Sequence, residues 1–419
     1  MRLLTLALGV MLASTAINLM FHALYSGPDL FKGRICETGH GFFPGPLFHP
    51  WDRFMDYFNM QAFKPAQGQT SALPPALILL YQLSGLLTSA TGPALSILAF
   101  SLFQMALFSA SICRLLSSPG VMPGLPFTTR LALAIAISIS SYPIYFAIDR
   151  GNFALIVCAL LNFAIGAHLR GRRWDAAILI GLAAALRITP LVFAAIYLNR
   201  RDFRYFLAAA ITAMLSCAIA MPAVALLLDG YTLNHWLDGF GGHDFMYTTW
   251  THGLGWSSSL YNFVRFARYL IGIPLDAILE SAYLAEKIYS LFALLLIMLI
   301  VWRIRTADDD ITSFALLAWA FVALPHVTGD YYLATLIGPM VLLATRQKPD
   351  LIALGLLVLL LVPKDYFYYY VMPHRIFDFP VQDFLEYHRL LSSGYKPSSI
   401  QSLIVNPLLL LWLLPRIAR

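Results

Sequence analysis

Long apolar stretches recur along almost the whole chain, and most approach the length of a membrane-spanning helix, about 20 residues. The candidate spans are residues 3–25, 74–91, 94–114, 128–148, 152–168, 205–228, 284–303, 311–325, 331–345, 350–363 and 401–416. Only 12% of the residues are charged, whereas a water-soluble domain carries about 25%. The sequence therefore predicts an all-α polytopic membrane protein, a single-domain bundle of about 10–13 transmembrane helices over residues 1–419.

The basic residues fall in short clusters at the ends of the apolar stretches. These clusters contain Arg170, Arg172, Arg173, Arg200, Arg201, Arg204, Arg303, Arg305, Arg346, Lys348, Arg416 and Arg419. Such clusters are typical of cytoplasmic loop anchors. The net charge of +6 therefore indicates membrane topology and contact with membrane lipids. It does not form the continuous stripe that binds nucleic-acid phosphates, so we expect no nucleic-acid partner.

Three polar segments, residues 26–73, 229–283 and 364–400, interrupt the apolar pattern. They are rich in aromatic residues, His, Gly and Pro and poor in basic clusters, which favours the extracytoplasmic side. Between residues 74 and 168 the number of apolar runs does not place every later loop on its expected side. One of those runs is then re-entrant, but no sequence argument identifies which.

Residues 174–198 are apolar, yet both flanks are strongly basic and Arg187-Ile188-Thr189-Pro190 interrupts the middle. A single crossing would leave one basic flank outside the cytoplasm. We therefore favour two half-helices that enter and leave on the cytoplasmic side, with Arg187 near the tip. A plain crossing helix is the alternative.

The first loop carries two carboxylates four residues apart, Asp52 and Asp56. If this stretch is helical, both lie on one helix face near the membrane surface, where either is a candidate catalytic group. The alternative is that both are solvated loop carboxylates.

Charged groups inside or beside apolar runs are costly in a membrane, so each is a candidate for function. Arg150 and Asn152 lie in the polar sequence Asp149-Arg150-Gly151-Asn152, which either offers donors to a phosphate or sugar or forms a tight turn with Asp149 and Arg150 paired. Arg187 inside its apolar run needs an anionic partner, which is either a ligand phosphate or a structural carboxylate.

His326 lies between two apolar runs, where a protonated imidazole binds phosphate or shuttles a proton. A hydrogen-bonded loop histidine is the alternative. In the central loop, His243 and Trp256 belong to a group of polar and aromatic residues that is typical of sugar sites and equally of interfacial belts. The four cysteines show no metal-ligand spacing, and we expect neither a metal nor a cofactor.

The order of these motifs resembles that of the GT-C fold glycosyltransferases. A first helix precedes an outside loop with an Asp beside an aromatic residue, and a Pro-Pro pair opens the next helix. A Gly-Asn turn, a broken helix with a basic residue and Pro, and a Pro-His motif follow. The chain most resembles glycosyltransferase family 87, the polyprenyl-phosphate-mannose-dependent α-mannosyltransferases.

The resemblance implies roles for residues in the first half of the chain. Asp56, which precedes Tyr57, matches the catalytic aspartate of the family's first loop, and Asp52 is the second choice. Tyr57 then belongs to the substrate site. Pro74-Pro75 matches the pair that opens the second helix, and Gly151-Asn152 corresponds to a Gly-Gln-x-Asn turn whose Gln is absent here.

Further along, Arg187 and Pro190 resemble a Lys-Pro element in which Arg replaces Lys and two residues are inserted. His326 resembles the family's histidine near the donor phosphate. The resemblance implies an inverting transfer of a sugar, mannose first, from a polyprenyl phosphate to a lipid or glycan acceptor. It places the protein in a bacterial inner membrane with a function in the cell envelope. A secondary transporter or lipid flippase is the alternative, although no inverted repeat is evident.

Overall fold

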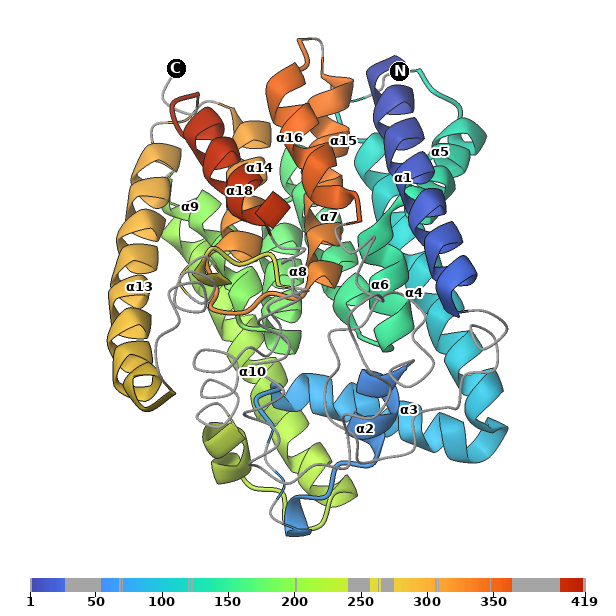
Figure 1. Ribbon diagram of the computed structural model, residues 1–419, viewed down its shortest axis with the longest axis vertical. Helices are drawn as coiled ribbons and strands as arrows, with labels where there is room; N and C mark the ends of the chain where they lie inside the picture. The colour runs from blue at the N-terminus through green and yellow to red at the C-terminus, as the bar shows by residue number, and fades with distance from the viewer. Residues whose placement is uncertain are drawn as a thin grey trace.

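The computed structural model describes most of the chain. The described residues are 2–26, 54–67, 69, 71–119, 121, 124–199, 202–239, 257–262, 264, 275–305, 307, 309–346, 348–363 and 400–416. Within these ranges the structure is helical, apart from one isolated antiparallel bridge between Ser257 and Gly329. The predicted all-α class is confirmed, and Figure 1 shows the helices gathered in one bundle.

The helices follow the predicted apolar runs closely, because each run supplies the side chains that the bundle buries. In chain order they are α1 (Arg2–Ser26), α2 (Met55–Gln61), η2 (Pro65–Gln67), α3 (Pro75–Thr91), α4 (Pro93–Leu116), α5 (Phe127–Ser140), α6 (Tyr142–Arg150), α7 (Ala154–Leu169), α8 (Arg173–Leu186), η3 (Thr189–Ala195), α9 (Ile196–Asn199), α10 (Phe203–Leu227), α13 (Leu275–Ile304), α14 (Asp310–Ala323), η4 (Asp330–Leu336), α15 (Ile337–Thr345), α16 (Leu351–Leu361) and α18 (Ile400–Leu413).

Four described helices are long and apolar enough to cross a membrane, namely α1, α4, α10 and α13. A fifth span results if α5 and α6 are counted together. The other apolar helices have 10–17 residues. The described part of the chain thus holds fewer full-length spans than the 10–13 expected, because several apolar runs fold as short helices that pair with one another.

Residues 173–199 form such a pair, as the sequence predicts. Arg173 at the start of α8 makes an ion pair with Asp202, just beyond α9, and the Tyr197 hydroxyl donates to the Arg173 carbonyl at 3.5 Å. Both ends of the segment therefore meet, and Arg187 lies at the tip between α8 and η3. Pro190 occupies the first turn of η3, where its missing N–H costs no helical hydrogen bond.

Two further helix pairs have the same form. The Arg346 guanidinium contacts Asp309 at 3.1 Å and joins the end of α15 to the start of α14. Arg416 contacts Asp350 at 3.0 Å and joins the end of α18 to the start of α16. His168 at the end of α7 lies 3.2 Å from Asp310. We call this common end, where the predicted basic clusters lie, the basic end. The opposite ends of the short helices form the tip level.

The predicted helix over residues 128–148 is broken. It forms α5 and α6, which are bent by 67° at Ser141. Pro143 follows the break in the first turn of α6, and a proline there removes no helical hydrogen bond. A bend of this size is found in a broken span or in a re-entrant loop. The bend turns the carboxyl end of α6 toward η4, against which it packs.

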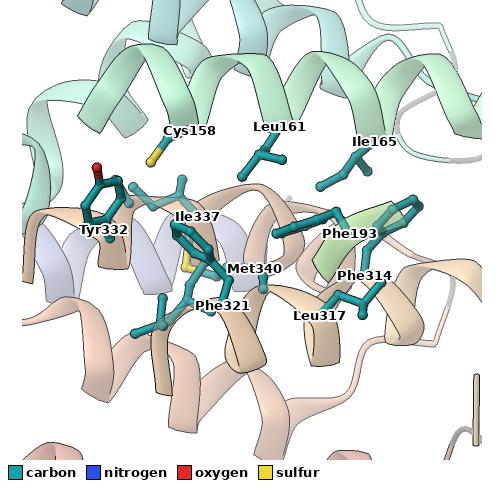
Figure 2. Packing of buried hydrophobic residues seen from close by; sticks show 14 of the residues in the cluster. Cys158, Leu161, Ile165, Phe193, Phe314, Leu317, Phe321, Tyr332, Ile337 and Met340 are labelled. Carbon is teal, nitrogen blue, oxygen red and sulfur yellow. The ribbon is translucent and has the colours of Figure 1, made fainter. Parts of the chain in front are cut away.

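The core lies between α7 on one side and η3, α14, η4 and α15 on the other. Figure 2 shows Cys158, Leu161 and Ile165 of α7 facing Phe193, Phe314, Leu317, Phe321, Tyr332, Ile337 and Met340. All of these side chains are buried. The spacing of three and four residues on α7 places its three side chains on one face. In Figure 2, Cys158 and Tyr332 lie at one end of this core, and Ile165 and Phe314 lie at the other.

Candidate functional site

The short helix α2 is fixed against the turn between α6 and α7. Phe54, which precedes α2, has a left-handed backbone (φ 58°), and its N–H donates to the Asp149 carbonyl at 2.6 Å. The Tyr57 ring is fully buried, and its hydroxyl shares a 2.5 Å hydrogen bond with Ser96 of α4. Tyr57 therefore contributes packing that holds α2 in place, and its predicted place in the substrate site stays a prediction.

Gly151 allows α2 to approach this closely. It ends α6 with a left-handed φ of 66°, a conformation that favours glycine. A Cβ atom at this position would lie 2.5 Å from the Tyr57 Cβ atom and 3.2 Å from the Tyr57 backbone nitrogen. The turn predicted around Gly151 is therefore the surface on which α2 is seated.

Replacing Gly151 with alanine is expected to destabilise the protein by about 2–4 kcal/mol, the sum of backbone strain and overpacking. Gly171→Ala is the matched control, because Gly171 also has a left-handed φ (76°) but has no atom within 4 Å of the added Cβ. Thermal unfolding in detergent measures both variants. Equal destabilisation would show that contact with α2 adds nothing to the cost at Gly151.

Asp56 projects from α2 toward the residue that follows Gly151. The Asn152 Nδ2 group donates to the Asp56 Oδ2 atom at 2.7 Å, and the Asn152 Oδ1 atom accepts from the Ala154 N–H at 2.9 Å. Asn152 is thus held at the start of α7 with its amide directed at the carboxylate. Burial raises the pKa of Asp56, while the Arg150 charge and the Asn152 hydrogen bond act in the opposite direction.

Aromatic residues form the surroundings of Asp56. The buried Tyr81 of α3 packs edge-on against Phe153, the residue after Asn152, with 4.7 Å between ring centroids. Tyr331 stacks on Phe146 with 5.7 Å between ring centroids. The helix α2 thus packs against α3, and η4 packs against α6 and α7 on either side of the Asn152 turn.

Arg187 lies at the edge of the same group. Its guanidinium lies over the Tyr332 ring at 4.1 Å, donates to the Val327 carbonyl at 3.2 Å and donates to Thr189 Oγ1 at 3.2 Å. These partners are neutral, and within the described part of the chain Arg187 makes no ion pair with a carboxylate. A partly buried cation with only neutral contacts favours an anionic ligand.

His326 belongs to a neighbouring aromatic cluster. Its Nε2 atom lies 3.2 Å from Ser290 Oγ, and its ring makes edge contacts with Tyr261 at 4.9 Å and Tyr289 at 5.3 Å. The adjacent Val327 carbonyl accepts from Arg187. The chain at His326 thus reaches the site, while the imidazole itself contacts α13 and the end of the central loop.

A run of three serines holds this tip in place, which sequence reasoning did not identify. Ser257 Oγ accepts from the Thr328 N–H at 3.2 Å, Ser258 Oγ donates to Asp330 Oδ1 at 2.6 Å, and Ser259 Oγ donates to the Pro325 carbonyl. Asp330 thereby has a structural role. Serine residues in a loop form no distinctive sequence pattern. These three serines are therefore recognised only from their contacts in the structure.

The remaining predicted site residues, Asp52, His243 and Trp256, lie outside the described residues. Among the residues that are described, no group of three or more His, Cys, Asp or Glu side chains is arranged to hold a metal ion. Of the predicted site residues, Asp56 and Asn152 are joined by a hydrogen bond beside Arg150. Arg187 instead contacts Thr189, Val327 and Tyr332.

Comparison with protein families identifies the family of the chain. The family model of glycosyltransferase family 87 matches residues 74–326, more than half of the chain. The chain belongs to glycosyltransferase family 87. The matched residues include Arg150, Asn152, Arg187 and His326, whereas Asp56 precedes them. A search of curated proteins found no match. This family 87 protein is therefore a glycosyltransferase embedded in a membrane, which confirms the predicted family and supports the transferase over the transporter alternative.

Proposed function

We propose that this glycosyltransferase moves a sugar, mannose in the first instance, from a polyprenyl phosphate to a hydroxyl of a lipid or glycan acceptor. The observation that carries the proposal is the presence of two groups, a carboxylate held in place by a hydrogen bond and an arginine without a carboxylate partner among the described residues. Asp56 is oriented by Asn152. Arg187 lies over the Tyr332 ring and has neutral partners alone in the described part of the chain. A base and a phosphate-binding cation are the two groups that this transfer requires.

In the proposed reaction, the Asp56 carboxylate takes the proton of the acceptor hydroxyl. The hydroxyl oxygen forms a bond to the anomeric carbon, and the bond from that carbon to the phosphate oxygen breaks. The bonding electrons leave with the lipid phosphate, whose charge Arg187 and Arg150 stabilise. Because one displacement occurs, the anomeric configuration inverts. His326, next to the Val327 carbonyl that Arg187 binds, is a further candidate for contact with the phosphate.

The depth of the site suits a lipid-linked donor. The 14 residues of α8 or α14 rise about 21 Å from the basic end to the tip level, while the 25 residues of α10 rise about 38 Å. The site at the tip level therefore falls within the layer that the long helices cross. With the basic end in the cytoplasm, the site opens toward the extracytoplasmic leaflet of what we propose to be a bacterial inner membrane.

Donor specificity tests the proposal. Purified protein in liposomes is given a lipid acceptor extract with radiolabelled polyprenyl-phosphate-mannose or with the nucleotide sugar GDP-mannose. We expect label to reach the extract from the lipid donor only, and nuclear magnetic resonance of the product to show an inverted anomeric configuration. Transfer from the nucleotide sugar alone would contradict a polyprenyl-phosphate donor.

The Asn152→Ala variant is expected to shift the pH dependence of transfer. Loss of the amide hydrogen bond removes an interaction with the ionised form of Asp56, so the pKa of Asp56 rises further. The acid limb of the kcat/KM profile then moves to higher pH, and the rate loss is about tenfold or more at acidic pH. Raising the pH recovers part of the rate.

Asn162→Ala is the matched control for this measurement. Asn162 is also buried on α7, but its amide donates to Ser111 at 3.3 Å, away from Asp56. We expect its pH profile to match that of the wild type even if its stability falls. An unshifted profile for Asn152→Ala would show that Asn152 does not act on the base.

A further inference from the structure

A second cationic site lies at the basic end, separate from Asp56. Arg114 is in the last turn of α4, Arg130 in the first turns of α5, and Arg170 follows α7. The Arg170 Nη1 group donates to Ser118 Oγ and to the Arg114 carbonyl, both at 3.2 Å. The Arg130 Nη1 group donates to Ser117 Oγ at 2.7 Å. Because the two serines are adjacent, the three arginines surround a single turn.

These three arginines have no carboxylate partner within the described ranges, and the sequence explains why. No Asp or Glu occurs between Asp56 and Asp149, so the segment that carries Arg114 and Arg130 brings no counter-ion of its own. Other arginines of the basic end do have carboxylate partners, in the pairs Arg172–Asp175, Arg173–Asp202, Arg204–Asp202, Arg346–Asp309 and Arg416–Asp350. Among the described residues, the charge of these three arginines is therefore not balanced by a carboxylate.

The Arg170 guanidinium is held in a defined position. It lies against Gly166 of α7, where a Cβ atom would be 3.2 Å from Nη2 and 3.3 Å from Nη1. The pKa of Arg170 is lowered by partial burial and then by the nearby Arg114 and Arg172 charges. Repulsion between like charges is relieved when an anion binds among them.

An exposed apolar helix face leads to the three arginines, as expected for a site that binds a lipid headgroup. Along α4, Phe103, Ala106, Ala110 and Arg114 are exposed at intervals of three and four residues, so they share one outward face. Because α4 is long and apolar enough to span the membrane, this apolar face meets the acyl chains and ends at a guanidinium. The Phe127 side chain, one turn before Arg130, is 62% exposed.

We propose that Arg114, Arg130 and Arg170 bind a phosphate group, supplied by the headgroup of an anionic membrane lipid. Guanidinium groups bind phosphate through paired, charge-assisted hydrogen bonds, and basic pockets between spanning helices recognise anionic headgroups. The lipid-facing position of Arg114 favours a lipid over free phosphate. This site is independent of the transfer reaction, which takes place at the tip level.

Native mass spectrometry of the full-length protein in detergent tests the proposal. The protein is titrated with phosphatidylglycerol, with phosphatidylcholine and with inorganic phosphate. The test variant is Arg114→Gln/Arg130→Gln/Arg170→Gln, and the matched control is Arg204→Gln/Arg305→Gln/Lys348→Gln, which loses the same charge from exposed positions of the basic end. We expect wild type and control to prefer phosphatidylglycerol, and the test variant to bind it about tenfold or more weakly.

Other outcomes would overturn the proposal. Equal phosphatidylglycerol binding by the test variant and the control would show that the three arginines do not bind the lipid. Inorganic phosphate that displaces phosphatidylglycerol at equal concentration would assign the site to a free phosphate instead of a lipid. If the triple variant does not fold, Arg114→Gln alone decides the matter, because the exposed Arg114 side chain makes no hydrogen bond or ion pair within the described ranges. We expect this single variant to weaken the lipid complex, and unchanged binding would contradict the proposal.

Discussion

Replacing Asp56 with asparagine is expected to lower kcat for sugar transfer by about 10²–10⁴-fold, the range that a general base contributes. Asparagine has nearly the same shape and its carbonyl still accepts from Asn152, but it does not take up a proton at neutral pH. The contacts that seat α2, from Phe54 to Asp149 and from Tyr57 to Ser96, do not involve the Asp56 side chain. We therefore expect the fold to be preserved.

Radiolabel transfer from polyprenyl-phosphate-mannose measures this effect, with the melting temperature recorded for each variant. Asp175→Asn is the matched control, because Asp175 is paired with Arg172 on the exposed surface of the basic end. Near-normal turnover in a folded Asp56→Asn protein would contradict the assignment of the base. Loss of activity in Asp52→Asn under the same conditions would then move the role to Asp52.

The Arg187→Gln variant is expected to lower kcat/KM for the lipid-phosphate donor by about 10²–10³-fold, as for other preorganised groups that stabilise transition-state charge. Arg187 is the cation at the site whose contacts we find to be neutral throughout the described residues. Glutamine keeps hydrogen-bonding capacity but removes the charge that the departing phosphate needs. Lysine in its place should recover part of the rate, since it keeps the charge without the paired donors.

Arg204→Gln is the control for Arg187→Gln. Both guanidiniums lie over a tyrosine ring, Arg204 over Tyr205 at 4.8 Å and Arg187 over Tyr332 at 4.1 Å. Arg204 lies at the basic end, beside Asp202, so its loss should leave kcat/KM unchanged. If Arg187→Gln keeps the wild-type kcat/KM but melts at a lower temperature, Arg187 has a structural role and does not bind the phosphate.

Several features of this protein follow from local sequence alone. Apolar runs bounded by basic residues determine helices and their ends, because a helix satisfies its backbone hydrogen bonds within its own segment, as a bilayer requires. Pro74-Pro75 starts α3 with Pro74 as its N-cap, and the basic flanks of residues 174–198 predict a hairpin with Arg187 at its tip. Each of these inferences depends on residues that are close together in the chain.

The tertiary structure decided which polar groups meet. Asp56 and Asn152 are 96 residues apart, and Arg187 and Val327 are 140 apart, so no local pattern predicts either contact. The same holds for the three serines that hold the residues around His326. The packing of α6 against η4, beyond the break at Ser141, is likewise a contact between segments far apart in the chain.

The difference between what local sequence predicts and what the tertiary structure decides has a physical cause. Hydropathy acts on each segment separately, since every spanning helix must satisfy its own backbone and present apolar side chains to lipid. The energy of a buried carboxylate or guanidinium depends instead on which partner the fold brings within a few ångströms. The sequence by itself therefore determined an all-helical membrane glycosyltransferase of family 87. Only the tertiary structure decided that Asn152 orients Asp56 and that Arg187 faces the site without a carboxylate partner among the described residues.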